Sequence, residues 1–481
     1  MLLRYLSLSL LFLYSSLAYA APKSFQEEIH TYFSPNGGAQ EAIVRNISQT
    51  KHSLDIAMYN FSSDRILEAL KTVRIKNPQV KIRMIFDDAA STNVDSPGSS
   101  SKADMSASLE KLGIDVRYVS KIMHHKFVII DGFPDGLQGN EDFSQTVLLN
   151  GSGNFSNRAD TSYDENLVEI KNDPETTTEF QKEFQLMWNY SYDFPDGSLQ
   201  EDREDYVSSL EPSDVITPIF TSQNFKKEPK FKLNGNRVAS LNLEEAIRNA
   251  KTSIYVATGH FRLKPLADAL ISAKQENPEL EIKVVLDSQE YVSQSEHQRV
   301  MGKYKRCVKD LGPNPSEEEL EKCELAGEMK FSRYLAQNGI DVRMKYSSYI
   351  WYYAYDPQMH HKYMIVDGET VWSGSYNWSR NAEFNTFENV VHYRGEALAP
   401  LVKAYEDDFL SIWDLRRDAF FAHKKQLETR NRVPLHFSPM SLSVAEIDEL
   451  WGVLLKDVPD FLQKAKPEDR IWDKRKGQGE P

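Results

Sequence analysis

Apolar residues recur along the chain with two different periods. Short runs rich in β-branched residues, such as Leu54–Met58 and Lys81–Phe86, predict buried strands. Between and after them, 64–75 and 103–112 have an apolar face at helical spacing, and 116–119 predicts a further strand. Because strands that alternate with helices form layered domains, we expect an α/β fold.

The same pattern occurs twice. Ser53–Phe61 is similar to Ser253–Phe261, and Lys81–Asp87 to Glu281–Asp287, at an offset of 200 positions. Gly113–Arg117 matches a later block at an offset of 226, so the second half contains 26 more residues between these blocks. A repeat of this length predicts two copies of one structural unit.

Both halves end with the same aromatic pair. Phe184 precedes Trp188 by four residues, and Phe409 precedes Trp413 by four. This spacing places both rings on one face of a helix, which is typical of core packing rather than of chemistry.

The expected organisation is a signal peptide at 1–20, a first lobe at 21–191, an acidic, turn-rich linker at 192–214, a second lobe at 215–414 and a tail at 415–481. Within the tail, Val444–Leu455 is apolar and predicts a helix packed on the second lobe.

The first twenty residues resemble a secretory signal. Arg4 is their only charge, an apolar run follows, and Ala18-Tyr19-Ala20 has small residues at the two positions that a signal peptidase reads. An uncleaved anchor helix is the alternative. We therefore expect an extracytoplasmic protein, in a periplasm or secreted.

Composition changes the picture in two respects. The 481 residues contain 57 Lys and Arg against 71 Asp and Glu, a net charge of -14, which argues against coating nucleic acid through bulk positive charge. A local basic groove stays open. Cys307 and Cys323 are the only cysteines, and an oxidising compartment would permit a disulfide between them, with two free thiols as the alternative.

Two nearly identical peptides are the most informative segments: Met123–Gly132 reads MHHKFVIIDG, and Met359–Gly368 reads MHHKYMIVDG. In each, a His and a Lys two residues apart point to one face of a strand, while the second His points the other way. Downstream stand Gly-Ser-Gly-Asn at 151–154 and Gly-Ser-Tyr-Asn at 374–377. Eleven residues after each Asn there is a Glu.

These motifs resemble the signature of the phospholipase D superfamily, His-x-Lys-x4-Asp followed by Gly-Ser-x-Asn, and both copies are complete. The form Met-His-His-Lys is most similar to the branch that contains bacterial secreted nucleases and mitochondrial cardiolipin hydrolases. The resemblance implies two lobes related by a pseudo-twofold axis, each a mixed β-sheet flanked by helices, that share one active site. It also implies a covalent phosphohistidine intermediate and neither a metal ion nor another cofactor.

Displacement at phosphorus needs a nucleophile and a proton donor in line on opposite sides, and two imidazoles provide them. We expect His124 to be the nucleophile and His360 the acid. The remaining candidates are the orienting carboxylates Glu165 and Glu388, and the groups that neutralise the phosphate oxygens: Lys126, Lys362, Ser152, Asn154, Ser375 and Asn377. Asp131 and Asp367 end the buried strands and are expected to brace the site.

The substrate is less clear from sequence. Seven aromatic or apolar residues lie just before the second motif, at 346, 349–353 and 355, where they suit a lipid interface, base stacking or simple packing. A phospholipid or a membrane surface is the expected partner, and one chain suffices for catalysis. The alternatives are an extracytoplasmic nuclease and an inactive binding protein. A nuclease needs a positive groove, for which the candidates are Lys121, Lys126, Arg158, Lys303, Lys305, Arg306 and Lys345.

Overall fold

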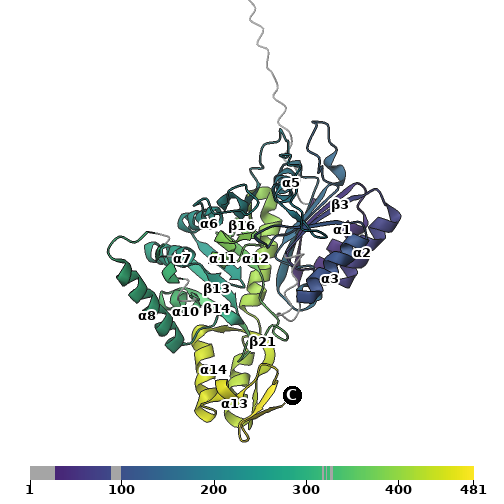
Figure 1. Ribbon diagram of the computed structural model, residues 1–481. Coiled ribbons are helices and arrows are strands. Elements are labelled where there is room, and N and C mark those ends of the chain that lie inside the picture. The colour runs from purple at the N-terminus through teal and green to yellow at the C-terminus, as the bar shows by residue number, and fades with distance from the viewer. Residues whose placement is uncertain (1–27, 88–98, 317–318, 321, 325–328, 481) are drawn as a thin grey trace, which may run out of the picture.

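The computed structural model describes residues 28–87, 99–316, 319–320, 322–324 and 329–480. The predicted signal peptide lies outside the described residues. Two eight-stranded mixed sheets dominate the structure (Figure 1), which confirms the expected α/β fold. Among the described residues, no helix combines the length and apolar character needed to cross a bilayer.

The first sheet is parallel in the middle and antiparallel toward both edges. Its strands, in spatial order, are β1 (Ile29–Ser34), β8 (Glu165–Lys171), β7 (Val147–Gly151), β6 (Lys126–Ile130), β2 (Ser53–Met58), β3 (Lys81–Phe86), β4 (Asp115–Tyr118) and β9 (Tyr192–Asp193).

The second sheet repeats this order strand for strand, as expected of a duplicated unit. Its strands are β10 (Ile216–Phe220), β19 (Asn389–Tyr393), β16 (Thr370–Gly374), β15 (Lys362–Val366), β11 (Ser253–Thr258), β13 (Glu281–Asp287), β14 (Asp341–Ser348) and β21 (His436–Ser443).

The two lobes extend slightly beyond the boundaries expected from composition. β9 lies at the start of the acidic segment 192–214, where it pairs with β4. β21 belongs to the expected tail, yet it pairs with β14 and closes the equivalent edge of the second sheet. Both edge strands are short or irregular, so they lack the long apolar run that announces a buried strand.

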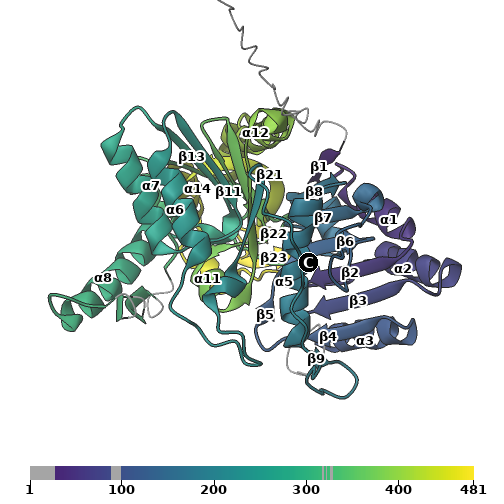
Figure 2. The same ribbon diagram turned by 90° about the horizontal axis from the view of Figure 1, so that it is seen from above.

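Helices cover the outer faces of both sheets (Figure 2). On the first sheet they are α1 (Ala39–Ser48), α2 (Asp64–Lys76) and α3 (Ser99–Lys111), and on the second α6 (Val238–Asn249), α7 (Lys264–Glu276), α8 (Gln294–Leu311) and α10 (Ser332–Gln337). The predicted helix at 64–75 is α2, whose N-cap Ser63 accepts a hydrogen bond from the backbone of Ile66.

Two helices, α5 (Pro174–Asn189) and α12 (Ala399–Trp413), lie between the sheets (Figure 2). Alternate strand residues face opposite sides: Met84 and Val128 contact the outer helices, whereas Ile85 and Phe127 join the central layer. This central layer contains apolar residues of both halves, so the two lobes share one core.

The repeated aromatic pairs are confirmed as core packing. The rings of Phe184 and Trp188 stack at 5.7 Å between centroids, and those of Phe409 and Trp413 at 5.9 Å. Arg83 covers the first pair and Arg343 lies 4.0 Å from the Trp413 ring, so each pair also accepts a cation–π contact.

The C-terminal residues form a small subdomain against the second lobe (Figure 1). Its elements are α13 (Ala419–Thr429), β20 (Arg432–Pro434), α14 (Val444–Asp457), α15 (Phe461–Lys464), β22 (Ile471–Asp473) and β23 (Gln478–Glu480). The predicted helix at 444–455 is α14, which starts with a capping box between Ser443 and Glu446. Its Ile447, Leu450 and Leu454 are buried in the core of the second lobe, as predicted.

Short elements occupy the connections. They are β5 (Ile122–Met123), β12 (Phe261–Arg262), β17 (Trp378–Ser379), β18 (Thr386–Phe387), α4 (Asn157–Thr161), α11 (Arg380–Phe384) and four short 3-10 segments at 143–145, 221–224, 288–290 and 396–398. Near the end of α8, a disulfide joins Cys307 to Cys323, with 5.6 Å between the Cα atoms. It resolves the choice that the sequence left open.

The aspartate that ends each His-x-Lys-x4-Asp motif binds the backbone at the start of a neighbouring strand. Asp131 accepts hydrogen bonds from the backbone N–H groups of Lys51, His52 and Ser53, at 2.7 to 3.2 Å. Asp367 does the same for residues 251–253. The two carboxylates therefore hold the starts of β2 and β11 in register with β6 and β15.

Replacing Asp131 with Ala should lower the free energy of unfolding by about 3 kcal/mol, because three buried or half-buried backbone donors lose a charged acceptor. Urea denaturation measures this loss. Asp135→Ala is the control, since Asp135 is exposed and forms only a surface ion pair with Lys81. Equal stability of the two variants would contradict the assignment.

Candidate active site

The two motif histidines lie where the lobes meet. The backbone N–H of His124 donates to the carbonyl of Phe387 at 3.0 Å, and that of His360 donates to the carbonyl of Asp164 at 3.0 Å. β5 and β18 pair in parallel at the first junction, and Asp164 bridges Met359 at the second. Each motif is therefore attached by its backbone to the opposite lobe.

Each histidine is also oriented by a glutamate of the opposite lobe. Nδ1 of His124 lies 2.8 Å from the Glu388 carboxylate, and Nδ1 of His360 lies 2.8 Å from that of Glu165. An ionised carboxylate can only accept, so whenever the glutamate is ionised the Nδ1–H of its histidine donates to it and Nε2 is left for a substrate. Both predicted orienting carboxylates are in position, exchanged between the lobes.

The two lysines share this site. The ammonium groups of Lys126 and Lys362 are buried and donate to the carbonyls of their own motif histidines, at 2.6 and 2.5 Å. Burial lowers the pKa of Lys126 to about 7 and that of Lys362 to about 8. Because Lys362 and the glutamates of both lobes act on Lys126, the two motifs form one electrostatic unit.

Both imidazoles are neutral in the resting protein. Burial, with the charges of Lys126 and Lys362, holds the pKa of His124 well below its usual range. Burial lowers the pKa of His360 to about 4, although Glu165 opposes the shift. Burial also raises the pKa of the Glu388 carboxyl to about 8. In the empty site, low polarity therefore outweighs the attraction between each imidazole and its carboxylate.

The Gly-Ser-x-Asn motifs position the glutamates. A Cβ atom on Gly151 would lie 2.1 Å from the carbonyl oxygen of Asn166, and one on Gly374 would lie 2.4 Å from that of Asn389, so only glycine allows this approach.

The following serines differ from the prediction that they contact phosphate. Ser152 and Ser375 are fully buried. Their hydroxyls accept hydrogen bonds from the backbone N–H groups of Asn166 and Asn389, at 2.9 and 3.0 Å. These asparagines directly follow Glu165 and Glu388 in the sequence. Both serines therefore fix the strands that present the glutamates.

The motif asparagines remain candidates for phosphate contacts. Asn154 and Asn377 are half-buried, and Asn377 lines the cavity next to His124. Asp131 and Asp367 are not part of this cluster. Each lies beyond the far end of its motif strand, roughly 15 Å from the lysine at the near end. They act on the fold and do not approach the reacting groups.

The second histidine of each pair joins the lobes from the other side. Nε2 of His125 lies 3.1 Å from Glu183, and its Nδ1 accepts from the amide of Asn389 at 3.1 Å. His361 is equivalent, with Asp408 at 3.2 Å and the Asn166 amide at 3.2 Å. Because neighbouring imidazoles serve different partners on opposite faces, the doubled His is not a paired metal ligand.

A cavity of about 610 Å³ opens next to His124 on the side of the second lobe. Besides His124 and Glu388, the cavity has basic and acidic lining residues that the sequence did not single out, namely His260, Arg262, Glu324, Lys330 and Arg380. Glu290 accepts from Arg262 at 2.6 Å and lies 3.3 Å from His260. In the second repeat, His260 stands at the position equivalent to Asn60. This change from Asn to His is the sequence feature that could have pointed to the cavity.

The two histidines have different surroundings. The Tyr59 ring lies 4.5 Å from that of His124, between centroids. The repeat has Gly259 at the equivalent position, and a Cβ there would lie 2.9 Å from the Met359 carbonyl. On the His360 side the neighbours are Tyr163 and, beyond it, Tyr353, at 6.2 Å in each case. The catalytic set is symmetric, but its walls are not.

The aromatic segment before the second motif has two roles. Tyr346 and Tyr349 are buried and pack on the C-terminal subdomain. Tyr352 and Tyr353 are 46% and 54% exposed, so only the tip of the segment is available to a ligand or a surface.

The candidate basic groove is only partly present. Lys345 is buried and forms an ion pair with Asp164 at 2.7 Å across the lobe junction. Lys303, Lys305 and Arg306 are exposed, but they lie on α8 at the outer side of the second lobe. Of the basic residues expected to form one groove, Lys126 and Lys345 are buried, three lie on α8, and Lys121 and Arg158 are half-buried.

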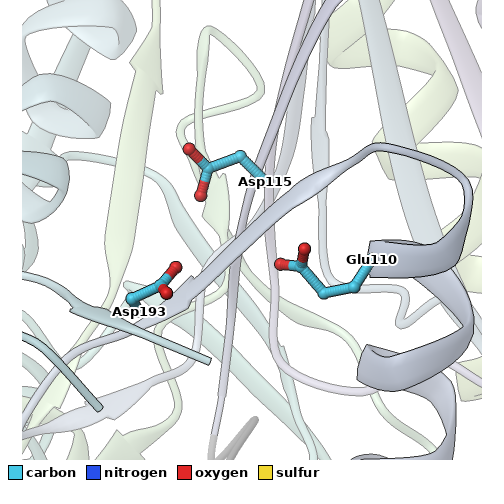
Figure 3. Close-up of side chains that lie close together, drawn as sticks. All are labelled: Glu110, Asp115 and Asp193. Carbon is cyan, nitrogen blue, oxygen red and sulfur yellow. The ribbon is translucent and has the colours of Figure 1, made fainter. Parts of the chain in front are cut away.

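Three carboxylates gather at the far edge of the first sheet (Figure 3): Glu110, Asp115 and Asp193. Arg117 donates to Asp115 at 2.9 Å, and Glu110 accepts from the backbone of Val116 at 2.8 Å. Figure 3 shows these carboxylates pointing toward one another from α3, β4 and β9. They are separate from the histidine cluster and are already bonded within the sheet edge.

The sequence matches the family described as cardiolipin synthase, PLD-like domain, at residues 43–188 and 243–413. These two stretches cover both repeats and more than half of the chain. The chain belongs to this family. The matched PLD-like regions include both His-x-Lys motifs, both glutamates and the two central helices.

Two relatives are named mitochondrial cardiolipin hydrolase. The protein of Chlamydomonas reinhardtii is 29% identical over 163 residues, which cover 33% of this chain and 62% of the relative. That of Xenopus laevis is 31% identical over 140 residues, or 29% and 55% of the two chains. The PLD-like chain thus spans about three fifths of these relatives' length.

A crystal structure of phosphatidylserine synthase from Haemophilus influenzae Rd KW20 has a similar fold. Its TM-score is 0.52 at 13% sequence identity, over 80% of this chain and 86% of the other. At this identity the similarity concerns the arrangement of the PLD-like lobes alone.

The depressed pKa of His360 predicts a loss of stability in acid. The unfolded chain takes up a proton on this residue near pH 6.5, whereas the folded protein does so only near pH 4. The free energy of unfolding should therefore fall as the pH is lowered from about 6.5 to about 4.

Urea denaturation across this range measures the effect, and His360→Gln should reduce the slope. A histidine NMR titration is the direct check: Glu165→Gln should lower the pKa of His360 further, because the carboxylate favours the charged imidazole. Titration of His360 near pH 6.5 in the native protein would contradict the description of the site.

Proposed function

We propose that the protein hydrolyses phosphodiester bonds of phospholipids through a phosphohistidine intermediate, without a metal ion and outside the cytoplasm. The exchange of glutamates between the lobes supports this proposal above all. It leaves two imidazoles with oriented Nε2 atoms and two buried lysines in a single site.

In the first step, Nε2 of His124 attacks phosphorus while His360 protonates the leaving oxygen. A P–N bond forms, the P–O bond to the headgroup alcohol breaks, and the proton of His360 goes to that oxygen. In the second step, His360 takes a proton from water, whose oxygen displaces His124 from phosphorus. The two carboxylates stabilise the imidazolium forms and keep each Nδ1 protonated.

His360 takes up the proton needed for the first step from solvent when the substrate anion binds. In the empty site, both imidazoles are neutral because they are buried next to two lysines. A phosphodiester anion between them offsets the lysine charges and thereby raises both histidine pKa values. The anion also favours the charged forms of Lys126 and Lys362, which then stabilise the developing charge on the non-bridging oxygens. Asn154 and Asn377 supply further donors.

These cationic and amide groups supply the charge stabilisation for which other phosphodiesterases use a divalent ion. The proposal of metal-independent catalysis rests on them and on the family resemblance, and EDTA tests it directly.

Three observations favour a lipid over a nucleic acid. The chain has a net charge of -14, and Lys345 of the expected groove forms a buried ion pair with Asp164. Exposed Tyr352 and Tyr353 suit the headgroup level of a membrane. Relatives named mitochondrial cardiolipin hydrolase are 29% and 31% identical over 33% and 29% of this chain.

An extracytoplasmic location is supported by the Cys307–Cys323 disulfide, because disulfides persist mainly in oxidising compartments. The predicted signal peptide provides the route, as cleavage after Ala20 would release the two lobes intact.

Replacing either active-site histidine should remove nearly all turnover. His124→Ala and His360→Ala should each lower kcat at least about a thousandfold, because the two rings act in consecutive halves of one reaction. Circular dichroism should show both variants folded, and His52→Ala, at an exposed position outside the site, should keep normal activity.

Quenching the wild-type reaction in base should trap a phosphoryl adduct on His124, detectable by mass spectrometry, since a phosphoramidate survives base and not acid. An adduct on His360 would reverse the two roles. Substantial turnover of either variant would contradict a shared site.

Substrate class is tested by incubating the protein with EDTA and either phospholipid vesicles or DNA in single- and double-stranded form. Release of the headgroup with intact DNA is the expected outcome. Cleaved DNA with intact lipid would show that the protein is a nuclease of the same chemistry and not a phospholipid hydrolase. Loss of all turnover in EDTA and its return with an added divalent ion would contradict metal independence.

A further inference from the structure

The disulfide-bonded insertion of the second lobe covers a second cavity. This cavity has a volume of about 550 Å³ and lies under α8, against α7 and α11. Its apolar lining residues are Leu233, Leu263, Pro265, Tyr304, Leu320 and Phe384. The bond between Cys307 and Cys323 ties the end of α8 to the segment that follows it. The insertion therefore lies beside this cavity.

This apolar cavity adjoins the one beside His124. Arg380 and Glu324 line both, so the two spaces meet at these side chains. The guanidinium of Arg380 lies 4.6 Å from the Phe384 ring centroid, at the boundary between the polar and the apolar part. The two neighbouring spaces match a molecule that has a phosphate at His124 and an apolar tail beyond Arg380 and Glu324.

Resting on the function proposed above, we propose that the apolar cavity binds an acyl chain of the phospholipid whose phosphate reacts at His124. Polar side chains, among them Asn236, Ser240 and Asp268, also line this space, but the larger part of its lining surface is apolar, which favours an acyl chain over a nucleoside. Arg380 is placed to donate to the ester carbonyls, where the chain leaves the glycerol backbone.

The position of the apolar cavity agrees with the order of the proposed reaction steps. When the P–O bond to the headgroup breaks and the P–N bond to His124 forms, the headgroup departs with the proton of His360. The diacylglycerol part stays attached to His124 through phosphorus until water breaks the P–N bond. The retained part must remain bound through both steps, and the apolar cavity lies on the side of His124, the residue to which it is attached.

The test places a carboxylate in the cavity without disturbing the reacting groups. Leu233 lines the cavity and is 44% exposed, so Leu233→Asp should fold normally. Leu241 on α6 is also 44% exposed and lines neither cavity, which makes Leu241→Asp a matched control. Pro265→Asp is a second variant, because Pro265 lies in the first turn of α7, where an acidic residue is favourable.

KM and kcat are measured for a dioleoyl and a dibutyryl phospholipid with the same headgroup, in mixed micelles, and for bis(4-nitrophenyl) phosphate. Leu233→Asp and Pro265→Asp should raise KM for the dioleoyl lipid about tenfold, because an apolar chain that enters the cavity would remove water from the new carboxylate. Their kinetics with the other two substrates should match those of the wild type, and Leu241→Asp should match it with all three.

The outcomes separate this proposal from the one on which it rests. Equal changes for long and short chains, or none for either, would overturn the acyl-chain site while the hydrolase activity stands. DNA cleavage that Leu233→Asp leaves unchanged would also overturn the acyl-chain site. Absence of turnover on every phosphodiester would overturn both proposals.

Discussion

The exchange of carboxylates between the lobes is the interaction on which the site depends. Glu388 of the second lobe orients His124 of the first, and Glu165 of the first orients His360 of the second. Neither lobe by itself contains both the first histidine of its motif and the glutamate that orients it. The shared central core, to which α5 and α12 contribute, therefore has a chemical function, since it keeps each glutamate within hydrogen-bonding distance of its ring.

A second set of contacts makes this exchange rigid. His125 bonds Glu183 and Asn389, and His361 contacts Asp408 and Asn166, again with one partner from each lobe. The asparagines adjoin the catalytic glutamates, so the same two strands serve both histidines of a pair. Because polar groups buried without partners are costly, a small rotation of one lobe against the other would break several hydrogen bonds at once.

The sequence predicted the parts of the site but not how they pair. The motifs, the glutamates and the central strands were visible because they recur at matched spacing. The partners of His124 and His360 were not, because they are 264 and 195 residues away and local patterns carry no information about such contacts. The carboxylates Glu183 and Asp408 each directly precede a repeated Phe, a signal that the strong aromatic pattern concealed. The hydrogen bonds by which Ser152 and Ser375 hold the glutamate strands were not predicted, because sequence does not show which side chains are fully buried.

The unequal residues at positions 59 and 259 bear on regiochemistry. Two equivalent imidazoles accept a phosphodiester in either of two opposite directions, and each direction cleaves a different ester bond. A tyrosine against one ring and a backbone-tight glycine beside the other give these two directions different surroundings. In the function proposed above, this difference distinguishes the end of the substrate that stays bound from the end that is released.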